Sequence, residues 1–480
     1  MDTTPNIRGP VTSRMALVLA IGFGAFAVAY LASSAMWLEL LGVVGLATLG
    51  VIVMLSPPRA AILWVVLGVT TFSWAGARVA GVTVTPDRVL FLLLITSLTL
   101  GWVRDRRSIL KISPSEFAMV FFLAMGTLSI LIGGGTKLTH SVGGLRGDLI
   151  HLAQGYAMPF AAFFIGKNLL RTDRDLHRIS WAFIMLGFAI GSFGILQQFL
   201  GMALLPNSGY VATAEGRSFG TLTGPIEFGI IVSAGFFAAL ATLPATRNGL
   251  ARVFLLATLL VTVVALVYSK TRGVLLGLAV GLVVIARFQP SLRRPLIIAS
   301  GLGVLALAAA WPILAETDLV RYRLTELSPI YNRVALSATA LNMASAHPII
   351  GSGFGKYTFA NGKWDYITSL EGIPSWYAVA PGVPHNEFLH ILVQLGLVGL
   401  FAYLVPLWLG YRSASRLHLN GRGFSEVQRR VLVISMALTL AYITNGMLVD
   451  LAACTYASLF VYLLLGLTDA MRVHAANGPD

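Results

Sequence analysis

Arginines in two short motifs are the residues of this sequence best suited to bind an anionic substrate. Arg217 lies in a polar run, Glu215 to Thr221, that ends shortly before Pro225 at the start of an apolar stretch. Lys270 and Arg272 share the motif Ser269-Lys270-Thr271-Arg272-Gly273 between two other apolar stretches. The arginine guanidinium is a planar fork that matches phosphate oxygens with two hydrogen bonds. Both motifs therefore indicate phosphate recognition, and the alternative is an arginine that reaches only to lipid headgroups.

A third motif combines a histidine with closely spaced glycines. His347 follows Arg333 and precedes Pro348, Gly351 and Gly353. The glycine run follows no predicted strand and opens no clear helix, so it does not indicate a nucleotide-binding loop. We expect the glycines to permit sharp turns or the close approach of a ligand, and His347 before proline to be structural.

His385 is the candidate general base. It stands in the motif Pro384-His385-Asn386-Glu387-Phe388, which leads into an apolar stretch containing Gly396-Leu397-Val398-Gly399. Histidine is the side chain that accepts a proton near neutral pH. The alternatives for a histidine at this position are a helix cap or a side chain at the membrane surface.

The composition requires that most of the chain lie within a membrane. Hydrophobic residues make up 56% of the 480 residues and charged residues 11%, whereas roughly 25% of a soluble domain is charged. The net charge of +14 is spread over short clusters between apolar runs, which argues against nucleic-acid binding. The single cysteine, Cys454, rules out an intramolecular disulfide and a cysteine-based metal site.

We predict an all-α, polytopic transmembrane bundle with about 12–14 spans and one large periplasmic loop. A membrane-spanning helix needs about 20 apolar residues. Fourteen runs meet or approach this length: 15–33, 36–55, 60–77, 85–103, 115–133, 149–169, 179–200, 224–243, 252–268, 272–287, 294–313, 386–410, 430–447 and 451–470. The chain then divides into spans 1–11 (1–313), a long extracytoplasmic loop (314–385), and spans 12–14 with a short cytoplasmic tail (386–480). In the loop, the helical spacing of residues near 331–345 predicts a short helix on the outer surface.

The distribution of basic residues sets the orientation of the spans. With the N-terminus in the cytoplasm, the inside segments hold 22 of the 34 Lys and Arg residues, as the positive-inside rule requires. The candidate residues then lie outside, as do the ionisable residues near the span ends, among them Asp87, Glu227, His390 and Asp450. Ionisable residues in spans are usually functional. A proton-coupled transporter should carry such groups near mid-membrane, and this placement puts none there.

Together these motifs resemble the O-antigen ligase and polymerase superfamily of bacterial envelope assembly. The resemblance covers roughly residues 210–410. It rests on Arg217 with the following Gly-Thr and Pro225, on Arg272-Gly273, on His347 to Gly353, and on His385-Asn386 with the later Gly-Leu-Val-Gly element. Fourteen predicted spans exceed the roughly twelve that are common in this superfamily, and the runs at 60–77 and 272–287 are the weakest of the fourteen.

The resemblance implies a glycosyltransferase of the bacterial inner membrane whose active face is periplasmic. Its donor would be an undecaprenyl-pyrophosphate-linked oligosaccharide, and its acceptor a glycan or a lipid-linked molecule. Arg217 and Arg272 would stabilise the pyrophosphate leaving group and His385 would be the base, so these three are the catalytic candidates. The substrate-binding candidates are Lys270, Arg333, Glu215, His347, Gly351, Gly353, Asn386 and Glu387. We expect no cofactor and no metal, because the outer segments carry no Asp-x-Asp element, and a single displacement would invert the anomeric centre.

Three classes of function remain distinguishable by experiment. The first is glycan transfer, in one of two forms: a polymerase extends one lipid-linked glycan with another, whereas a ligase passes the glycan to a different acceptor, such as a lipid A core. The alternative from another class is a transporter of a glycolipid or small solute, which needs polar groups along a continuous path through the membrane. A third possibility is a non-catalytic assembly or sensing protein, in which His385 and the arginines could be replaced without loss.

Overall fold

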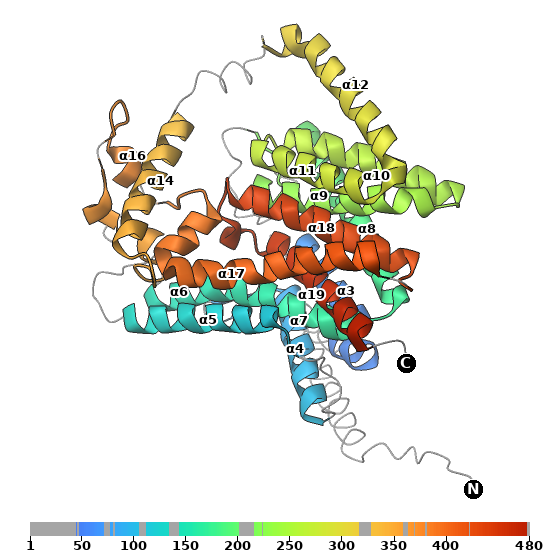
Figure 1. The fold of residues 1–480 in the computed structure, drawn as a ribbon, viewed down its shortest axis with the longest axis horizontal. Helices are drawn as coiled ribbons and strands as arrows, with labels where there is room; N and C mark the ends of the chain where they lie inside the picture. Colours follow the sequence, from blue (N-terminus) through green and yellow to red (C-terminus); the bar gives the residue numbers. More distant parts are fainter. Residues whose placement is uncertain are drawn as a thin grey trace, which may run out of the picture.

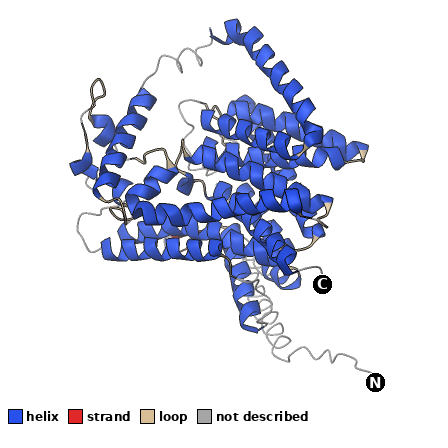
Figure 2. Ribbon diagram, viewed as in Figure 1, coloured by secondary structure: helices blue, strands red, loops and turns tan. Residues whose placement is uncertain are grey.

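The computed structural model describes most of the chain and is almost entirely helical, as Figures 1 and 2 show. The described residues are 45, 48–71, 77–79, 82–104, 112–133, 144–200, 216–222, 224–315, 328–358, 363–368, 370–379, 382–421 and 423–477. The predicted all-α, polytopic bundle is confirmed. The predicted spans 15–33 and 36–55 lie mostly outside the described residues.

The elements of the bundle are mostly long apolar helices. The longer helices are α3 (Pro57–Thr71), α4 (Pro86–Arg104), α5 (Pro114–Gly133), α6 (Gly144–Leu152), α7 (Met158–Leu169), α8 (Asp173–Leu200), α9 (Pro225–Thr242), α10 (Gly249–Tyr268), α11 (Arg272–Phe288), α12 (Pro290–Ala315), α14 (Ser328–Ala346), α17 (Glu387–Asn420), α18 (Glu426–Gly446) and α19 (Thr455–Asn477). The short elements are β1 (Ala77–Val79), β2 (Val82–Val84), η1 (Ala153–Ala157), η2 (Leu243–Ala245), η3 (Lys356–Thr358), η4 (Trp364–Tyr366), α16 (Trp376–Val379) and η5 (Leu451–Ala453). Strands β1 and β2 pair antiparallel as a small hairpin, with Ala77 opposite Val84.

Eight helices in the described part of the chain are long and apolar enough to cross a membrane. They are Pro114–Ile132, Leu145–Leu169, Asp173–Leu200, Pro225–Ala245, Gly249–Tyr268, Glu387–Asn420, Glu426–Gly446 and Thr455–Ala475. Each coincides with one of the fourteen predicted spans. The predicted spans at 60–77, 85–103, 272–287 and 294–313 are helices as well (α3, α4, α11 and α12), and their crossing of the membrane stays a prediction.

The centre of the bundle is built from helices that are apolar on all sides. About nine-tenths of the most apolar windows of α9 and α19 are buried inside the protein, whereas only 28% of the window of α10 is. Helix α19 packs along α7, and α11 packs along α18. A helix that is hydrophobic all around must be covered by other helices, so α9 and α19 form the core and α10 faces outward.

In the sequence, Gly273, Gly277 and Gly281 are spaced at i, i+4 and i+8, which predicts close helix packing in α11. A side chain at Gly277 would collide with the backbone carbonyl of Ala441 in α18, and one at Gly281 with the ring of Phe237 in α9. Small residues let neighbouring backbones approach closely in membrane proteins. The glycines that follow Arg272 therefore fix the position of α11, and with it the position of Arg272.

The ionisable residues are not confined to one end of the spans, which corrects the sequence prediction. Lys167 is fully buried and pairs with Glu116 at 2.6 Å and with Asp469 at 3.0 Å. These residues lie at the start of α5 and near the C-terminal ends of α7 and α19. Lys167 lies near the end of the predicted span 149–169, where the ends of three helices converge and each buried charge gains a partner.

Helix α14 occupies the range of the short helix predicted near 331–345. It lies with α16 at the end of the bundle where α17 begins, on the left in Figure 1. Leu336, Ala340 and Met343 face the protein, whereas Val334 and Leu341 are exposed. Tyr357 fixes α14 to the following loop, because its hydroxyl donates a hydrogen bond to the Leu336 carbonyl at 2.5 Å.

Candidate functional site

The Arg217 segment, residues 216–222, is held by the C-terminal end of α8. The Gln197 amide oxygen accepts hydrogen bonds from the backbone N–H groups of Phe219 and Gly220, and its NH₂ group donates to the Gly220 carbonyl at 2.8 Å. The Ser218 hydroxyl donates to the Gly194 carbonyl at 2.6 Å. These bonds satisfy backbone N–H and C=O groups of an irregular segment. They hold the half-buried Arg217 in a fixed position.

The Arg217 segment and the Lys270–Arg272 turn are direct neighbours. The Ser218 N–H donates to the Tyr268 carbonyl at 3.0 Å, where α10 ends. A side chain built at Gly216 would lie 3.7 Å from the Lys270 Nζ. Two motifs separated by about fifty residues in sequence therefore form one cationic surface. Arg272 opens α11, where the helix dipole disfavours a cation, so its position is not explained by helix stability.

His385 and Lys270 are the non-glycine residues with positive φ in the described part of the chain, at 52° and 50°. Such a backbone conformation costs of order 1–3 kcal/mol and is concentrated at functional sites. After His385, the Asn386 side chain accepts a hydrogen bond from the Leu389 N–H at 3.0 Å and caps α17. The Glu387 N–H donates to the Val449 carbonyl at 3.1 Å. The strained conformation of His385 is thus held by bonds on its C-terminal side.

His385 and three arginines lie close enough together for the charge of one to affect the pKa of another. The charges of Arg217 and Arg272 act on Arg333, whose pKa is lowered by desolvation first and then by these two cations. Burial lowers the pKa of His385, Arg333 lowers it further, and Asp450 opposes the shift. The lowered pKa favours the neutral form of His385, which is the form that can accept a proton. Arg333 on α14 links the arginines near α11 to the histidine before α17.

Behind His385 lies a buried polar cluster, Glu387, His390 and Asp450. The Glu387 carboxylate accepts from the N–H groups of Leu451 and Ala452 at 2.8 and 3.0 Å and from the Tyr156 hydroxyl at 2.9 Å. The Nδ1 atom of His390 lies 3.4 Å from a carboxylate oxygen of Asp450. Burial alone would raise the pKa of Asp450, but His390 holds it well below its usual range. Glu387 anchors η5 from the interior, and its predicted role in substrate binding stays a prediction.

The ligand atoms of Glu387, His390 and Asp450 lie within 4.8 Å of one another, so this cluster has residues of metal-binding type. Both oxygens of Glu387 already accept hydrogen bonds from the protein. The cluster therefore has an explanation without an ion, and the absence of an essential metal stays a prediction.

The glycine-rich run after His347 packs against a break in α17. Gly396 has a φ of 65°, which interrupts the helix and frees backbone groups on both sides. The N–H groups of Ser352 and Gly353 donate to the carbonyls of Val393 and Gln394 at 2.8 and 3.1 Å, and the N–H groups of Leu397 and Val398 donate to the carbonyls of Pro348 and Ile349. A side chain at Gly351 would collide with the Gln394 backbone. Gly351 and Gly353 are thus required for packing, by the sharp turns that the sequence predicted.

His347 lies apart from the arginines. It follows the C-terminus of α14, about 20 Å along the helix from Arg333 at 1.5 Å per residue. Its Nε2 atom is 2.9 Å from the Tyr366 hydroxyl, and its side chain is exposed. This geometry agrees with a structural role for His347. Glu215, another predicted substrate-binding residue, lies outside the described residues.

Asp450 is the residue that the sequence did not place in the site. In the sequence, Asp450 is one of several ionisable residues at the predicted outer ends of spans, and nothing distinguishes it from the others. Its effect on His385 arises because η5 folds back against the start of α17, and this contact between distant segments has no local sequence pattern.

Comparison with known proteins identifies a family over the middle of the chain. Residues 257–404 match the family model described as O-antigen ligase. No curated protein matches the chain. The matched range contains Arg272, Arg333, His347 and His385 and ends within α17, just after the break at Gly396, whereas Arg217 lies before it.

Proposed function

We propose that the chain transfers glycan from an undecaprenyl-pyrophosphate-linked donor to a hydroxyl group of an acceptor, because residues 257–404 match the family model described as O-antigen ligase. This match supports a role for the multi-pass membrane protein in assembling cell-surface polysaccharide. The proposal adds the donor, the chemistry and the face of the membrane: transfer takes place at the extracytoplasmic face of the bacterial inner membrane, where the donor lipid presents its glycan.

The observation that carries the proposal is the convergence of Arg217, Arg272, Arg333 and His385 from four separate segments. Three guanidinium groups close together favour the binding of a polyanionic ligand, and a pyrophosphate matches them in charge and geometry. The neutral histidine beside them has the protonation state needed to remove a proton from a hydroxyl group.

The transfer step follows from this arrangement. His385 accepts the proton of the acceptor hydroxyl as the oxygen attacks the anomeric carbon of the donor sugar. The bond from that carbon to the pyrophosphate oxygen breaks, its electron pair passes to this oxygen, and undecaprenyl pyrophosphate leaves. Arg217, Arg272 and Arg333 stabilise the negative charge that grows on the leaving group. A single displacement inverts the anomeric configuration.

A deletion strain tests the proposal and separates its two forms. Accumulation of single lipid-linked repeat units indicates a polymerase, and accumulation of long lipid-linked polymer indicates a ligase. Complementation with wild-type protein should remove either intermediate, whereas His385→Ala should not. A strain with normal surface polysaccharide and no accumulated lipid-linked intermediate contradicts the proposal.

A further inference from the structure

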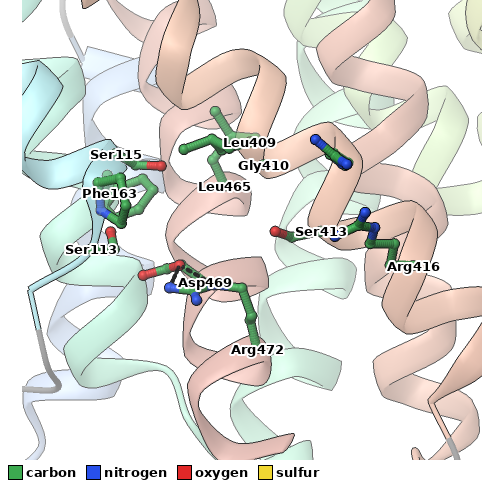
Figure 3. Close-up of a pocket in the computed structure, with 12 residues that line it drawn as sticks. Ser113, Ser115, Phe163, Leu409, Gly410, Ser413, Arg416, Leu465, Asp469 and Arg472 are labelled. Atoms are coloured by element: carbon green, nitrogen blue, oxygen red, sulfur yellow. Dashed lines mark hydrogen bonds and ion pairs between the residues drawn. The ribbon is translucent and has the colours of Figure 1, made fainter. Parts of the chain in front are cut away.

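A polar cavity lies at the end of the bundle opposite His385. It has a volume of about 270 Å³ and is formed by the start of α5, the C-terminal half of α17, α7 and the C-terminal part of α19. Figure 3 shows Ser113 and Ser115 on one side of this space and Ser413 and Arg416 on the other. Arg412 also lines the cavity. Beyond the break at Gly396, α17 extends about 22 Å from Leu397 to Arg412 at 1.5 Å per residue, so the cavity is remote from the transfer site.

The cavity carries excess positive charge. Asp469 is paired with Lys167 at 3.0 Å and with Arg472 at 2.7 Å, as the dashed contact in Figure 3 marks for Arg472. Glu116 is paired with Lys167 as well, so two acids balance two cations. Within the described residues, no acidic side chain pairs with Arg412 or Arg416, and these two guanidinium groups are left for an anion.

A buried hydroxyl group also faces this cavity. Ser113 is 3% exposed and lines the cavity, and its Oγ atom has no hydrogen-bond partner among the described residues. Leaving a buried hydroxyl unsatisfied costs about 1–3 kcal/mol. The backbone N–H of Ser113 is already bonded to the Glu116 carboxylate at 2.6 Å, so only the hydroxyl group of Ser113 is left for a ligand. An oxygen-rich anion at this position would satisfy the hydroxyl and neutralise the arginines together.

An apolar groove continues from the cavity between α5 and α17. It has a volume of about 480 Å³ and shares Pro114 with the cavity. Its walls include Phe117, Phe121 and Phe401, all of them exposed. The groove reaches Leu397, so with Leu409 in the cavity it extends about 18 Å along α17. One leaflet of a bilayer with a ~30 Å hydrocarbon core has a similar depth.

We propose that the cavity binds the phosphate headgroup of an anionic phospholipid from the leaflet opposite the transfer site, with an acyl chain in the groove between α5 and α17. Bidentate guanidinium contacts from Arg412 and Arg416 hold the phosphate, and Ser113 donates to it. The excess charge selects an anionic headgroup over a zwitterionic one. The lipid bridges α5 and α17, and this site does not depend on the proposed glycan transfer.

Melting of the purified, delipidated full-length protein in detergent tests the site. Long-chain phosphatidylglycerol should raise the melting temperature, and phosphatidylcholine at the same mole fraction should raise it much less. Binding to the folded state stabilises it by an amount that grows with the logarithm of the ligand concentration relative to Kd. Inorganic phosphate at the same concentration should have little effect. If inorganic phosphate stabilises as strongly as the lipid, the ligand is a soluble phosphate and the lipid assignment is wrong.

Two arginine pairs supply the matched variants. Arg412→Gln with Arg416→Gln should weaken the apparent affinity for phosphatidylglycerol by about tenfold or more, which is the loss of roughly one charged hydrogen bond. Arg293→Gln with Arg294→Gln makes the same charge change at exposed residues of α12 outside the cavity and should leave the affinity unchanged. Should the first pair fail to fold, Ser113→Ala and native mass spectrometry of lipid bound to the wild-type protein provide the measurement. Equal effects of the two lipids, or equal affinity in both double variants, overturn the proposal.

Discussion

His385 combines a left-handed backbone with a depressed pKa, and both features come from its neighbours. Asn386 and Glu387 hold the backbone, while burial and Arg333 keep the imidazole neutral. We expect His385→Ala to remain folded and to lower glycan transfer by roughly 10²–10⁴-fold, the usual contribution of a general base. The measurement is transfer from purified lipid-linked donor, with melting in detergent as the folding control. His347→Ala is the matched control, and a larger loss there than in His385→Ala would move the catalytic role.

The pH dependence of transfer should respond in opposite directions to two substitutions near His385. The neutral histidine is the active form, so the acidic limb of the rate profile reports its pKa, which lies below the ordinary value. Arg333→Gln removes a cation that lowers this pKa, so the limb should move to higher pH. Asp450→Asn removes an anion that raises it, so the limb should move to lower pH. Profiles of the maximal rate measure both shifts, and shifts in the same direction contradict the assignment.

Arg272 tests whether a guanidinium or only a positive charge is needed. Lysine keeps the charge but cannot form two parallel hydrogen bonds to a phosphate group. We therefore expect Arg272→Lys to lose nearly as much transfer activity as Arg272→Ala, on the order of 10–100-fold for one charged hydrogen bond. Steady-state transfer rates at saturating acceptor give the comparison. If lysine restores most of the activity, Arg272 acts through general electrostatics.

At the scale of elements, the break in α17 is the feature that connects the family motifs. The helix begins directly after His385, and the break at Gly396 is closed by the run from Pro348 to Gly353. In a membrane, backbone groups freed by such a break must find partners within the protein. The glycine-rich run supplies them and thereby positions the start of α17.

Gly396→Ala should therefore destabilise the protein. A side chain there would stand 2.2 Å from the Ile349 carbonyl oxygen, on a backbone with positive φ. We expect a loss of at least about 1–3 kcal/mol, from backbone strain alone, seen as a lower melting temperature. Gly301→Ala in α12 is the control, because nothing lies within 4 Å of its added methyl group. It should be neutral or slightly stabilising, and a similar loss in both variants would show that the break is not responsible.

At the scale of the whole molecule, the two ends of the bundle carry different chemistry. One end has the three arginines and His385, and the other has the cavity near Arg412 together with the buried Lys167 pairs. From the basic clusters in the sequence, we predict that the first end lies on the extracytoplasmic side. Helix α17 spans both ends, so it joins the two polar regions.

Cysteine labelling tests this orientation. Cys454 is the single native cysteine and is buried, so the background should be low. Glu371→Cys should react with an impermeant thiol reagent in intact spheroplasts, because Glu371 is exposed in the long loop. Arg294→Cys, exposed at the start of α12, should react only after the membrane is made permeable. The opposite pattern would reverse the topology and place the arginine site in the cytoplasm.

The helical class, eight helices long and apolar enough to span a membrane, and the resemblance to the O-antigen ligase family could all be predicted from the sequence alone. These depend on hydropathy, charge asymmetry and short motifs, all of which are local properties of the chain. The sequence also predicted the packing role of Gly277 and Gly281, because helical spacing puts them on one face. Tertiary structure decided that Glu387 is a buried anchor, that Asp450 acts on His385, and that Lys167 is an interior charge. These outcomes depend on which helix ends meet across the bundle, and long-range contacts of this kind leave no periodic signal in the sequence.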